Sequence, residues 1–409
     1  MKRFMKGRKA RLCLSLLAFV FTFSGLSAQE VIQFNEKKAV KDDKNCEFTE
    51  TSSLDFVKNM TCGWNLGNTM EAVGISGSAS ETFWGQPSTT KAMIDTLAAS
   101  GIKSIRIPVS WSNHMDKKYT IDQSWMKRVK QIVDWAIEDG MYVIINTHHD
   151  NWEKGDKIPT AKGYYPNQAC FEESERFLTN VWTQISLAFN NGYDQHLIFE
   201  TLNEPRLRGT SQEWWNNRGT DTYKEGAEYL NKLNQVCLDA IRKSGGNNAK
   251  RFVMIPGLRA AVDSALAPEF SLPQDSAEDK LILSVQMYDA QDFAMNTPGA
   301  KKFVQAHKDA LNRSFDSLYE AYISKGIPVV IGEYAATNKD NLEERVKWTN
   351  FFLEESRKYG MTACLWDNGG FDASTSQGEK YGFFDRRALK WVFPEIIDAI
   401  VKSTNSIVK

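Results

Sequence analysis

Cysteine is scarce in this sequence of 409 residues, which contains six. Cys13 lies in the N-terminal leader, and no pair among the other five has the spacing of a zinc site. An odd number of cysteines in a chain long enough to bury a sizeable core indicates no disulfide framework, although a single pair can still form in an oxidising compartment. Cys62 and Cys364 lie inside apolar runs, so we expect them to be buried as small hydrophobic side chains.

A strong net charge is also missing, because 50 Lys/Arg nearly balance 51 Asp/Glu. The first 28 residues contain six Lys/Arg and no acid, so without them the formal charge falls from −1 to about −7. A mildly acidic chain lacks the basic surface that nucleic acids and anionic membranes require. We therefore expect neither as a partner.

The apolar run within the first 28 residues, from Leu12 to about Phe23, is too short to span a membrane as a helix. Six Lys/Arg precede it, and Leu26-Ser27-Ala28 supplies small residues for cleavage. This pattern predicts a secretory signal peptide over residues 1–28 and a secreted or periplasmic protein. The alternative is a membrane anchor that stays uncleaved.

Repeats of fixed period and low-complexity linkers are absent too. Residues 29–52 are polar and charged without a clear period, and we expect them to form a mobile or loosely docked leader. From about Ser53 onward, short runs rich in Val, Ile and aromatic residues alternate with stretches of helical spacing. The eight short runs cover residues 62–67, 103–111, 141–149, 196–204, 251–257, 281–288, 328–334 and 361–368.

Four of the intervening stretches have clear helical spacing, at residues 89–101, 124–140, 228–246 and 342–360. Strands that alternate with helices form parallel sheets, and runs without strict polar alternation are covered on both faces. Eight such units predict an α/β fold, a closed (β/α)8 TIM barrel, as a single catalytic domain over residues 53–409. An open doubly wound sheet is the alternative, but no glycine-rich phosphate turn follows the first run.

Unusual polar residues lie at seven of the eight predicted strands, mostly at the ends where barrels of this kind gather their chemistry. Because the carboxyl ends of the strands meet at one face of a barrel, we expect these side chains to lie in one site. They are Asn65, Arg106, His148-His149-Asp150, Asn203-Glu204, Gln286 with Tyr288, Glu333, and Trp366-Asp367-Asn368.

Two carboxylates facing one another across a cleft are suited to glycoside hydrolysis. We assign Glu204 as acid/base, with a pKa raised by burial and by the second carboxylate, and Glu333 as the nucleophile, kept ionised by Arg106. A mechanism that retains the anomeric configuration predicts about 5 Å between the two carboxyls. Asn203 can bind the 2-hydroxyl of the sugar and Tyr288 can donate to Glu333.

Several tryptophans offer flat faces on which a sugar ring can stack. We assign Trp366 to the substrate. Loop tryptophans are either substrate platforms or packing residues; they are Trp84, Trp111, Trp152, Trp214 and Trp215.

The ordered set GWNLGNTMEA, IRIPVSW, IINTHHD, IFETLNEPR, IGEY and LWDNG resembles glycoside hydrolase family 5, in its bacterial branch of endo-β-1,4-glucanases and xyloglucanases. The resemblance covers roughly residues 54–400. It implies a retaining mechanism without metal or organic cofactor, with Glu204 as acid/base and Glu333 as nucleophile. Other active-site positions of the family fall on Arg106, His148, Asn203, Tyr288 and Trp366.

Gln286 departs from this resemblance, because the family usually has histidine there. Glutamine can bind a sugar hydroxyl but cannot carry a proton or a charge. We assign Gln286, His149 and Asn65 to substrate binding or support. A metal-binding alternative for the consecutive histidines is disfavoured, because adjacent strand residues point to opposite faces. For Glu200 a structural role paired with Arg106 is favoured.

The sequence thus predicts a retaining, endo-acting hydrolase of β-1,4-glucan backbones. Cellulose-type glucan, mixed-linkage glucan and xyloglucan stay open as its substrate, and the sequence does not determine the oligomeric state. The alternative from another class is a carbohydrate-binding barrel whose catalysis is weak or lost because of Gln286.

Overall fold

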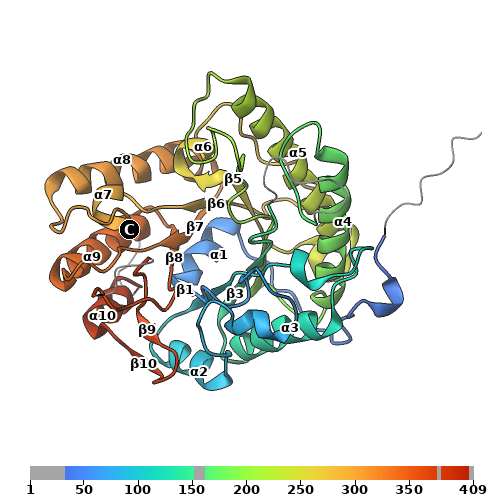
Figure 1. The fold of residues 1–409 in the computed structure, drawn as a ribbon, viewed down its shortest axis with the longest axis horizontal. Coiled ribbons are helices and arrows are strands. Elements are labelled where there is room, and N and C mark those ends of the chain that lie inside the picture. The colour runs from blue at the N-terminus through green and yellow to red at the C-terminus, as the bar shows by residue number, and fades with distance from the viewer. Residues whose placement is uncertain (1–32, 152–161, 375–378, 405–409) are drawn as a thin grey trace, which may run out of the picture. The chain divides into compact units, whose positions relative to one another are not determined.

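A computed structural model describes residues 33–151, 162–374 and 379–404, and within it all eight predicted strands are present. They form a closed barrel in chain order, with parallel neighbours and β1 paired to β8 (Figure 1). The predicted TIM barrel is confirmed. The strands are β1 Cys62–Asn65, β2 Ser104–Ile107, β3 Tyr142–Asn146, β4 Leu197–Glu200, β5 Val253–Ala261, β6 Leu281–Gln286, β7 Val329–Tyr334 and β8 Thr362–Leu365.

The four predicted helices are also present, and the other long helices complete the outer layer. Thr90 caps α2 by accepting from the Met93 amide at 3.3 Å, and Gly101, with φ of 94°, ends the segment in a left-handed turn. The main helices are α1 Ser53–Met60, α2 Lys91–Ala99, α3 Gln123–Glu138, α4 Phe171–Ala188, α5 Asp221–Lys243, α8 Gln305–Ala321, α9 Leu342–Lys358 and α10 Pro394–Thr404.

Short elements lie in the connecting loops. Two four-residue helices follow β5 and β6, and a two-stranded hairpin lies between β8 and α10. These elements are α6 Val262–Ala265, α7 Gln291–Ala294, β9 Phe384–Asp385, β10 Lys390–Trp391, and the 3-10 turns η1 Glu36–Lys38, η2 Ser78–Thr82, η3 Ser112–His114, η4 Gly246–Ala249 and η5 Ile323–Lys325.

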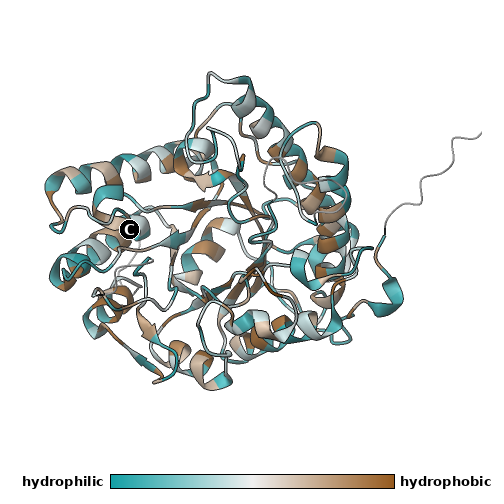
Figure 2. Cartoon of the chain, viewed as in Figure 1, coloured by the Kyte–Doolittle hydropathy of each residue, from teal (hydrophilic) through white to brown (hydrophobic). Residues whose placement is uncertain are grey.

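Helix α1 packs against barrel residues near the amino ends of the strands. Its apolar face, Phe56, Val57 and Met60, belongs to a buried cluster with side chains from six strands. The same helix lies within the ring of strands in Figure 1, and Figure 2 shows that these strands are largely hydrophobic. An apolar layer against α1 therefore closes the amino-terminal end of the barrel.

The described part of the polar leader, residues 33–52, is docked rather than loose. Phe34 and Phe48 are buried, and the Phe34 amide donates to Asn180 of α4 at 2.7 Å. Asp42 accepts from the amides of Asn190 and Gly192, in the turn between α4 and β4. Of the two states that we expected for this segment, mobile or loosely docked, the docked one applies to residues 33–52, because two aromatic side chains anchor them on the barrel.

The predicted signal peptide, residues 1–28, lies outside the described residues. Within the described ranges, no helix is both long enough and apolar enough to cross a membrane. The five described cysteines are free, and Cys62 and Cys364 are buried as expected.

Candidate active site

Arg106 on β2 contacts four side chains inside the barrel. It is fully buried, and its guanidinium lies 2.7 Å from Glu200 and 2.8 Å from Glu333. It also donates to the Oδ1 atoms of Asn65 at 2.9 Å and of Asn203 at 2.6 Å. A planar fork of donors can serve several acceptors at fixed angles. Arg106 therefore fixes side chains from three other strands or strand ends relative to one another, and the predicted contacts with Glu200 and Glu333 are found.

Glu333 owes its position to a register shift between β6 and β7. Val285 pairs with Ile331 and the next residue, Gln286, pairs with Glu333, so Gly332 is an extra residue on β7. A Cβ on Gly332 would lie 3.4 Å from Arg106 Nε and from Glu200 Oε1. An extra residue of this kind re-aims the side chain that follows it. The glycine leaves room for the ion pairs and turns Glu333 toward Arg106.

The carboxylate of Glu333 accepts on both oxygens. Arg106 donates to Oε1, and the Tyr288 hydroxyl donates to Oε2 at 2.9 Å, as the sequence predicts. Burial raises the pKa of Glu333, while Arg106 and Tyr288 act in the opposite direction. Two donors on the ionised form stabilise the charge that a nucleophile needs.

Glu204, four residues after Glu200, has different surroundings. Burial, followed by the negative charge of Glu333, raises its pKa to about 7. The nearby charges of Arg206 and Arg106 oppose this rise, but the net direction is upward. A carboxyl with this pKa keeps its proton over part of the neutral range. The two glutamates are thus electrostatically linked but differ in their partners, because Glu333 receives hydrogen bonds from Arg106 and Tyr288.

Asn203 is held with its amide in one orientation. Gln286 Nε2 donates to Asn203 Oδ1 at 2.9 Å, and Arg106 donates to the same oxygen. Two donors require an oxygen at that position, so the Asn203 amino group points the other way. Gln286, which replaces the expected histidine, therefore supports Asn203 through a hydrogen bond that does not depend on a titratable proton.

His148 and His149 lie in the same pocket with their rings perpendicular, at a centroid distance of 4.5 Å. Asn146 contacts His148 Nδ1 at 3.1 Å, and Trp84 lies 5.6 Å from His149. Burial lowers the pKa of His149 to about 3 and that of His148 well below its usual value. Among the described residues, no group of three His, Cys, Asp or Glu is arranged to hold a metal ion.

Asn65 supports the site from within the barrel wall. It is fully buried, donates to the carbonyl of Gly332 at 2.9 Å and accepts from Arg106. It therefore acts through Arg106. Trp366 lies parallel to His148 at a centroid distance of 6.1 Å and is 8% exposed. Its assignment to a sugar ring stays a prediction.

The residue after Trp366 has a structural role in the last loop of the barrel. Asp367 is buried and accepts from Trp64 Nε1 at 2.9 Å and from the amides of Gly369 and Phe384. It braces the last loop of the barrel. Asp150, which follows β3, holds the loop after β2 by accepting from the Trp111 and Ser112 amides.

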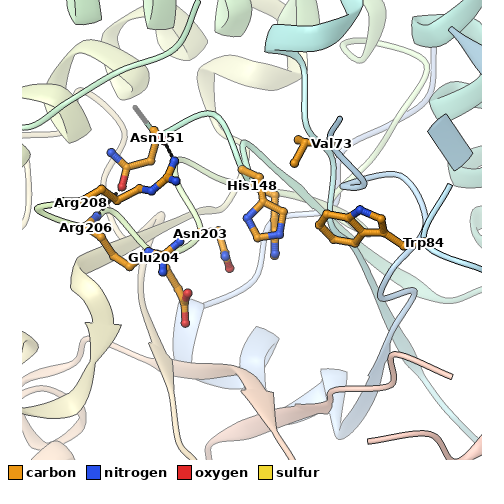
Figure 3. Close-up of a pocket in the computed structure, with 9 residues that line it drawn as sticks. Val73, Trp84, His148, Asn151, Asn203, Glu204, Arg206 and Arg208 are labelled. Carbon is orange, nitrogen blue, oxygen red and sulfur yellow. Dashed lines mark hydrogen bonds between the residues drawn. The ribbon is translucent and has the colours of Figure 1, made fainter. Parts of the chain in front are cut away.

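Two hollows meet at Glu204. One, of about 480 Å³, lies between the loops that follow β1, β3 and β4, and Figure 3 shows its side chains with Glu204 and Trp84 on opposite sides of His148. The other, of about 1410 Å³, extends over the loops that follow β4, β5 and β6 to α8. Its lining includes Trp214, Trp215 and Tyr288. Glu204 thus lies where an open cleft continues in two directions.

Sequence reasoning missed several side chains that complete the site. Asn146 and Ser284 both bind Glu200, and Arg206 and Arg208 line the smaller hollow. Asn146 lies two residues before His148, and this spacing places both on one face of a strand. This two-residue spacing was the feature of the sequence from which Asn146 could have been assigned to the site.

Comparisons with known proteins agree with this geometry. A family profile described as cellulase (glycosyl hydrolase family 5) matches residues 67–372. Endoglucanase B of Ruminococcus albus is 42% identical over 365 residues, covering 88% of this chain and 83% of the relative. Endoglucanase B of Clostridium cellulovorans is 37% identical over 410 residues, covering 98% and 86%.

Solved structures give the same result. A broad-specificity endoglucanase of family 5 from Ruminococcus champanellensis, with bound cellotriose, has a TM-score of 0.79 and 37% identity, covering 87% of this chain and all of that one. A family 5 lichenase from a Caldicellulosiruptor species, in complex with cellotetraose, has a TM-score of 0.81 and 38% identity, covering 91% and 100%.

Proposed function

The chain belongs to the cellulase family of glycosyl hydrolases, family 5, and we propose that it is a retaining endo-β-1,4-glucanase. The observation that carries this proposal is a pair of glutamates with unlike surroundings, Glu333 buried and Glu204 partly buried in the cleft. Glu333 is bonded to Arg106 and Tyr288, whereas the pKa of Glu204 is raised to about 7. Such a division lets one carboxyl attack while the other donates a proton.

In the first step, Glu333 attacks the anomeric carbon as the glycosidic bond breaks. Glu204 gives its proton to the departing oxygen, and a glycosyl ester forms on Glu333. In the second step, Glu204, now ionised, takes a proton from water, and the resulting hydroxide cleaves the ester with net retention. The charge of Glu333 raises the pKa of Glu204 only while Glu333 is ionised, so ester formation favours the switch of Glu204 from acid to base.

Retention requires the two carboxyls to lie about 5 Å apart, because no water fits between nucleophile and sugar. We propose this separation for Glu204 and Glu333. It is supported by the electrostatic effect of Glu333 on Glu204. NMR of the first product to appear, before mutarotation, should show the β-anomer; an initial α-anomer contradicts the mechanism.

The two hollows that meet at Glu204 support cleavage inside a polymer. A glucan chain bound across Glu204 can continue in both directions, with Trp84 on one side and Trp214 and Trp215 on the other as faces for stacking. Trp215 is 74% exposed, which suits a platform for a ligand. For an endo-acting enzyme, the viscosity of a glucan solution falls early relative to the release of reducing ends.

The finer substrate choice is part of the proposal. The larger hollow is open to solvent along the loops that follow β4, β5 and β6, which supports a branched chain such as xyloglucan as a substrate beside unbranched and mixed-linkage glucans. We also propose that residues 1–28 direct export, which makes the protein secreted or periplasmic. Fractionation of cells that express the full chain, followed by N-terminal sequencing, tests the cleavage after Ala28.

The decisive experiment compares Glu204→Gln and Glu333→Gln with wild type on soluble β-glucan, xyloglucan and mannan. Each variant should lower turnover by several orders of magnitude. Glu213→Gln is the matched control, because Glu213 lies in the loop after β4 but bonds to the Gly209 amide and Arg206. Near-wild-type turnover in both glutamate variants ends the assignment. Retention of the wild-type protein in glucan gels without sugar release indicates the binding-only alternative.

A further inference from the structure

The side-chain amide of Asn146, on β3, has only one orientation that satisfies its surroundings. The backbone amide of Val109 donates to Asn146 Oδ1 at 3.1 Å, and a backbone N–H accepts nothing. The oxygen of the amide must therefore face Val109. The amino group then faces two acceptors, Glu200 Oε2 at 2.8 Å and His148 Nδ1 at 3.1 Å.

This orientation determines where the proton of His148 lies. Asn146 Nδ2 has two hydrogens, one for each of its acceptors, so His148 Nδ1 receives a hydrogen bond and carries no proton. In a neutral imidazole the proton is then on Nε2. Burial, His149 and Arg106 all lower the pKa of His148, so the neutral ring is the stable form.

Because Nδ1 is bonded to Asn146, Nε2–H is the polar group of the His148 ring that can bind a ligand in the cleft. The ring is buried except for 4% of its surface and lines the smaller hollow with Asn203 and Glu204. In Figure 3 His148 lies between Asn203 and Trp84 in this hollow. A donor at this position matches the oxygen of a sugar hydroxyl.

We propose that Asn146 is a positioning residue, which holds His148 as the Nε2–H tautomer so that it donates a hydrogen bond to a hydroxyl oxygen of the glucose unit at the cleavage point. The proposal rests on the glucanase function for its ligand. Its first test, the position of a proton in the free protein, does not.

Asparagine is needed here because an aspartate in its place reverses the hydrogen bond. An ionised carboxylate at position 146 has no hydrogen to donate, so His148 Nδ1 must supply one. A protonated carboxyl at this position has a single hydrogen, which the carboxylate of Glu200 takes. Glu200 keeps its other donors, Arg106 at 2.7 Å and Ser284 at 2.6 Å. In either protonation state, Asn146→Asp places a proton on His148 Nδ1.

The first experiment is long-range ¹H–¹⁵N NMR of the imidazoles in the full chain, with His148→Ala to assign the signal. The sequence has five histidines, so the spectrum is simple enough to resolve. Wild type should show Nε2 protonated and Nδ1 bare, and Asn146→Asp should show Nδ1 protonated. A wild-type protein with the proton on Nδ1 overturns the proposal, even if the variant does not fold.

The second experiment is a double-mutant cycle on β-glucan hydrolysis. Loss of one donor to the substrate should lower kcat/KM roughly 10- to 100-fold in Asn146→Asp. In a His148→Ala background, the same substitution should have little further effect. An equal loss in both backgrounds assigns Asn146 to the structural support of Glu200 and contradicts the proposal.

Asn234→Asp is the matched control for the cost of the substitution itself. Asn234 is equally buried, but it accepts from Thr201 and donates to the Pro256 carbonyl, away from His148. This variant should leave the tautomer of His148 unchanged and show no coupling to His148→Ala. If wild type hydrolyses no glucan, the glucanase proposal fails, while the NMR result still tests Asn146.

Discussion

Replacing Arg106 by methionine tests whether one buried cation holds both interior carboxylates. Methionine has a comparable reach but no charge and no donors, so Glu200 and Glu333 lose a partner that lies 2.7 and 2.8 Å away. Breaking a buried ion pair costs about 3–5 kcal/mol, because the other charge stays buried without a partner. Since the free energy of unfolding of a domain is about 5–15 kcal/mol, this loss of stability should be measurable.

The loss of stability in Arg106→Met should depend on pH with a definite sign. Burial already raises the pKa of Glu333 above its ordinary value of 4.5, and without Arg106 that pKa rises further. The folded variant then binds more protons than the unfolded chain between the two pKa values. Its stability is therefore highest below the unfolded pKa and falls as the pH rises through the folded one.

The difference in unfolding free energy between wild type and Arg106→Met should consequently grow with pH. Between about pH 5 and pH 7.5 it should increase by about 1.4 kcal/mol for each pH unit by which the pKa of Glu333 moves within that window. Urea unfolding followed by tryptophan fluorescence at both pH values measures it.

Arg251→Met is the matched control. Arg251 is also fully buried, but its hydrogen bonds in the described chain go to backbone carbonyls, such as that of Leu197, and to Asn248 Oδ1. Burial lowers its pKa to about 9, above the pH window, so its loss should destabilise equally at both values. If Arg106→Met also destabilises equally at pH 5 and 7.5, the reasoning about the carboxylates is refuted.

Three further predictions follow from the same site and from one buried histidine. The pH profile of kcat/KM should fall on its basic side with a midpoint near 7, because Glu204, whose pKa is about 7, must be protonated to act as the acid; a basic limb above pH 9 contradicts this role. Gln286→His should add an acidic limb to the pH profile of kcat/KM. Gln286→Ala should lower kcat about tenfold, because Asn203 loses the hydrogen bond from Gln286. Unchanged rates and pH profiles in both variants contradict the role of Gln286 in supporting Asn203. Burial lowers the pKa of His114 to about 4, below its value in the unfolded chain. The free energy of unfolding should therefore fall as the pH drops from 6.5 toward 4, by at most about 3 kcal/mol. In urea unfolding, His114→Phe should remove this pH dependence; an unchanged pH dependence means that another group causes it.

The strands and the strand ends were within reach of sequence reasoning. Apolar runs separated by helical stretches leave a closed parallel barrel as the simplest fold, and all eight runs became strands. The carboxyl ends of such strands share one face. Arg106, Asn203, Tyr288 and Glu333 were therefore expected together, and their hydrogen bonds join them.

The docking of residues 33–52 could not be predicted from the sequence in the same way. Residues 33–52 look loose by composition, but Phe34 and Phe48 anchor them on the barrel. The docking sites are formed by turns that come more than 100 positions later, such as the one at Asn190. Local pattern carries no information on a contact of that kind.

The sequence alone determined the barrel and the family, and it placed two glutamates at strand ends, because these depend on periodicity and on the order of short motifs. Only the tertiary structure decided how the side chains share their hydrogen bonds. Arg106 reaches Glu333 across 227 positions, and the extra residue Gly332 turns Glu333 toward it. Registers between distant strands determine such pairings, since a shift of one residue reverses the face on which every following side chain lies.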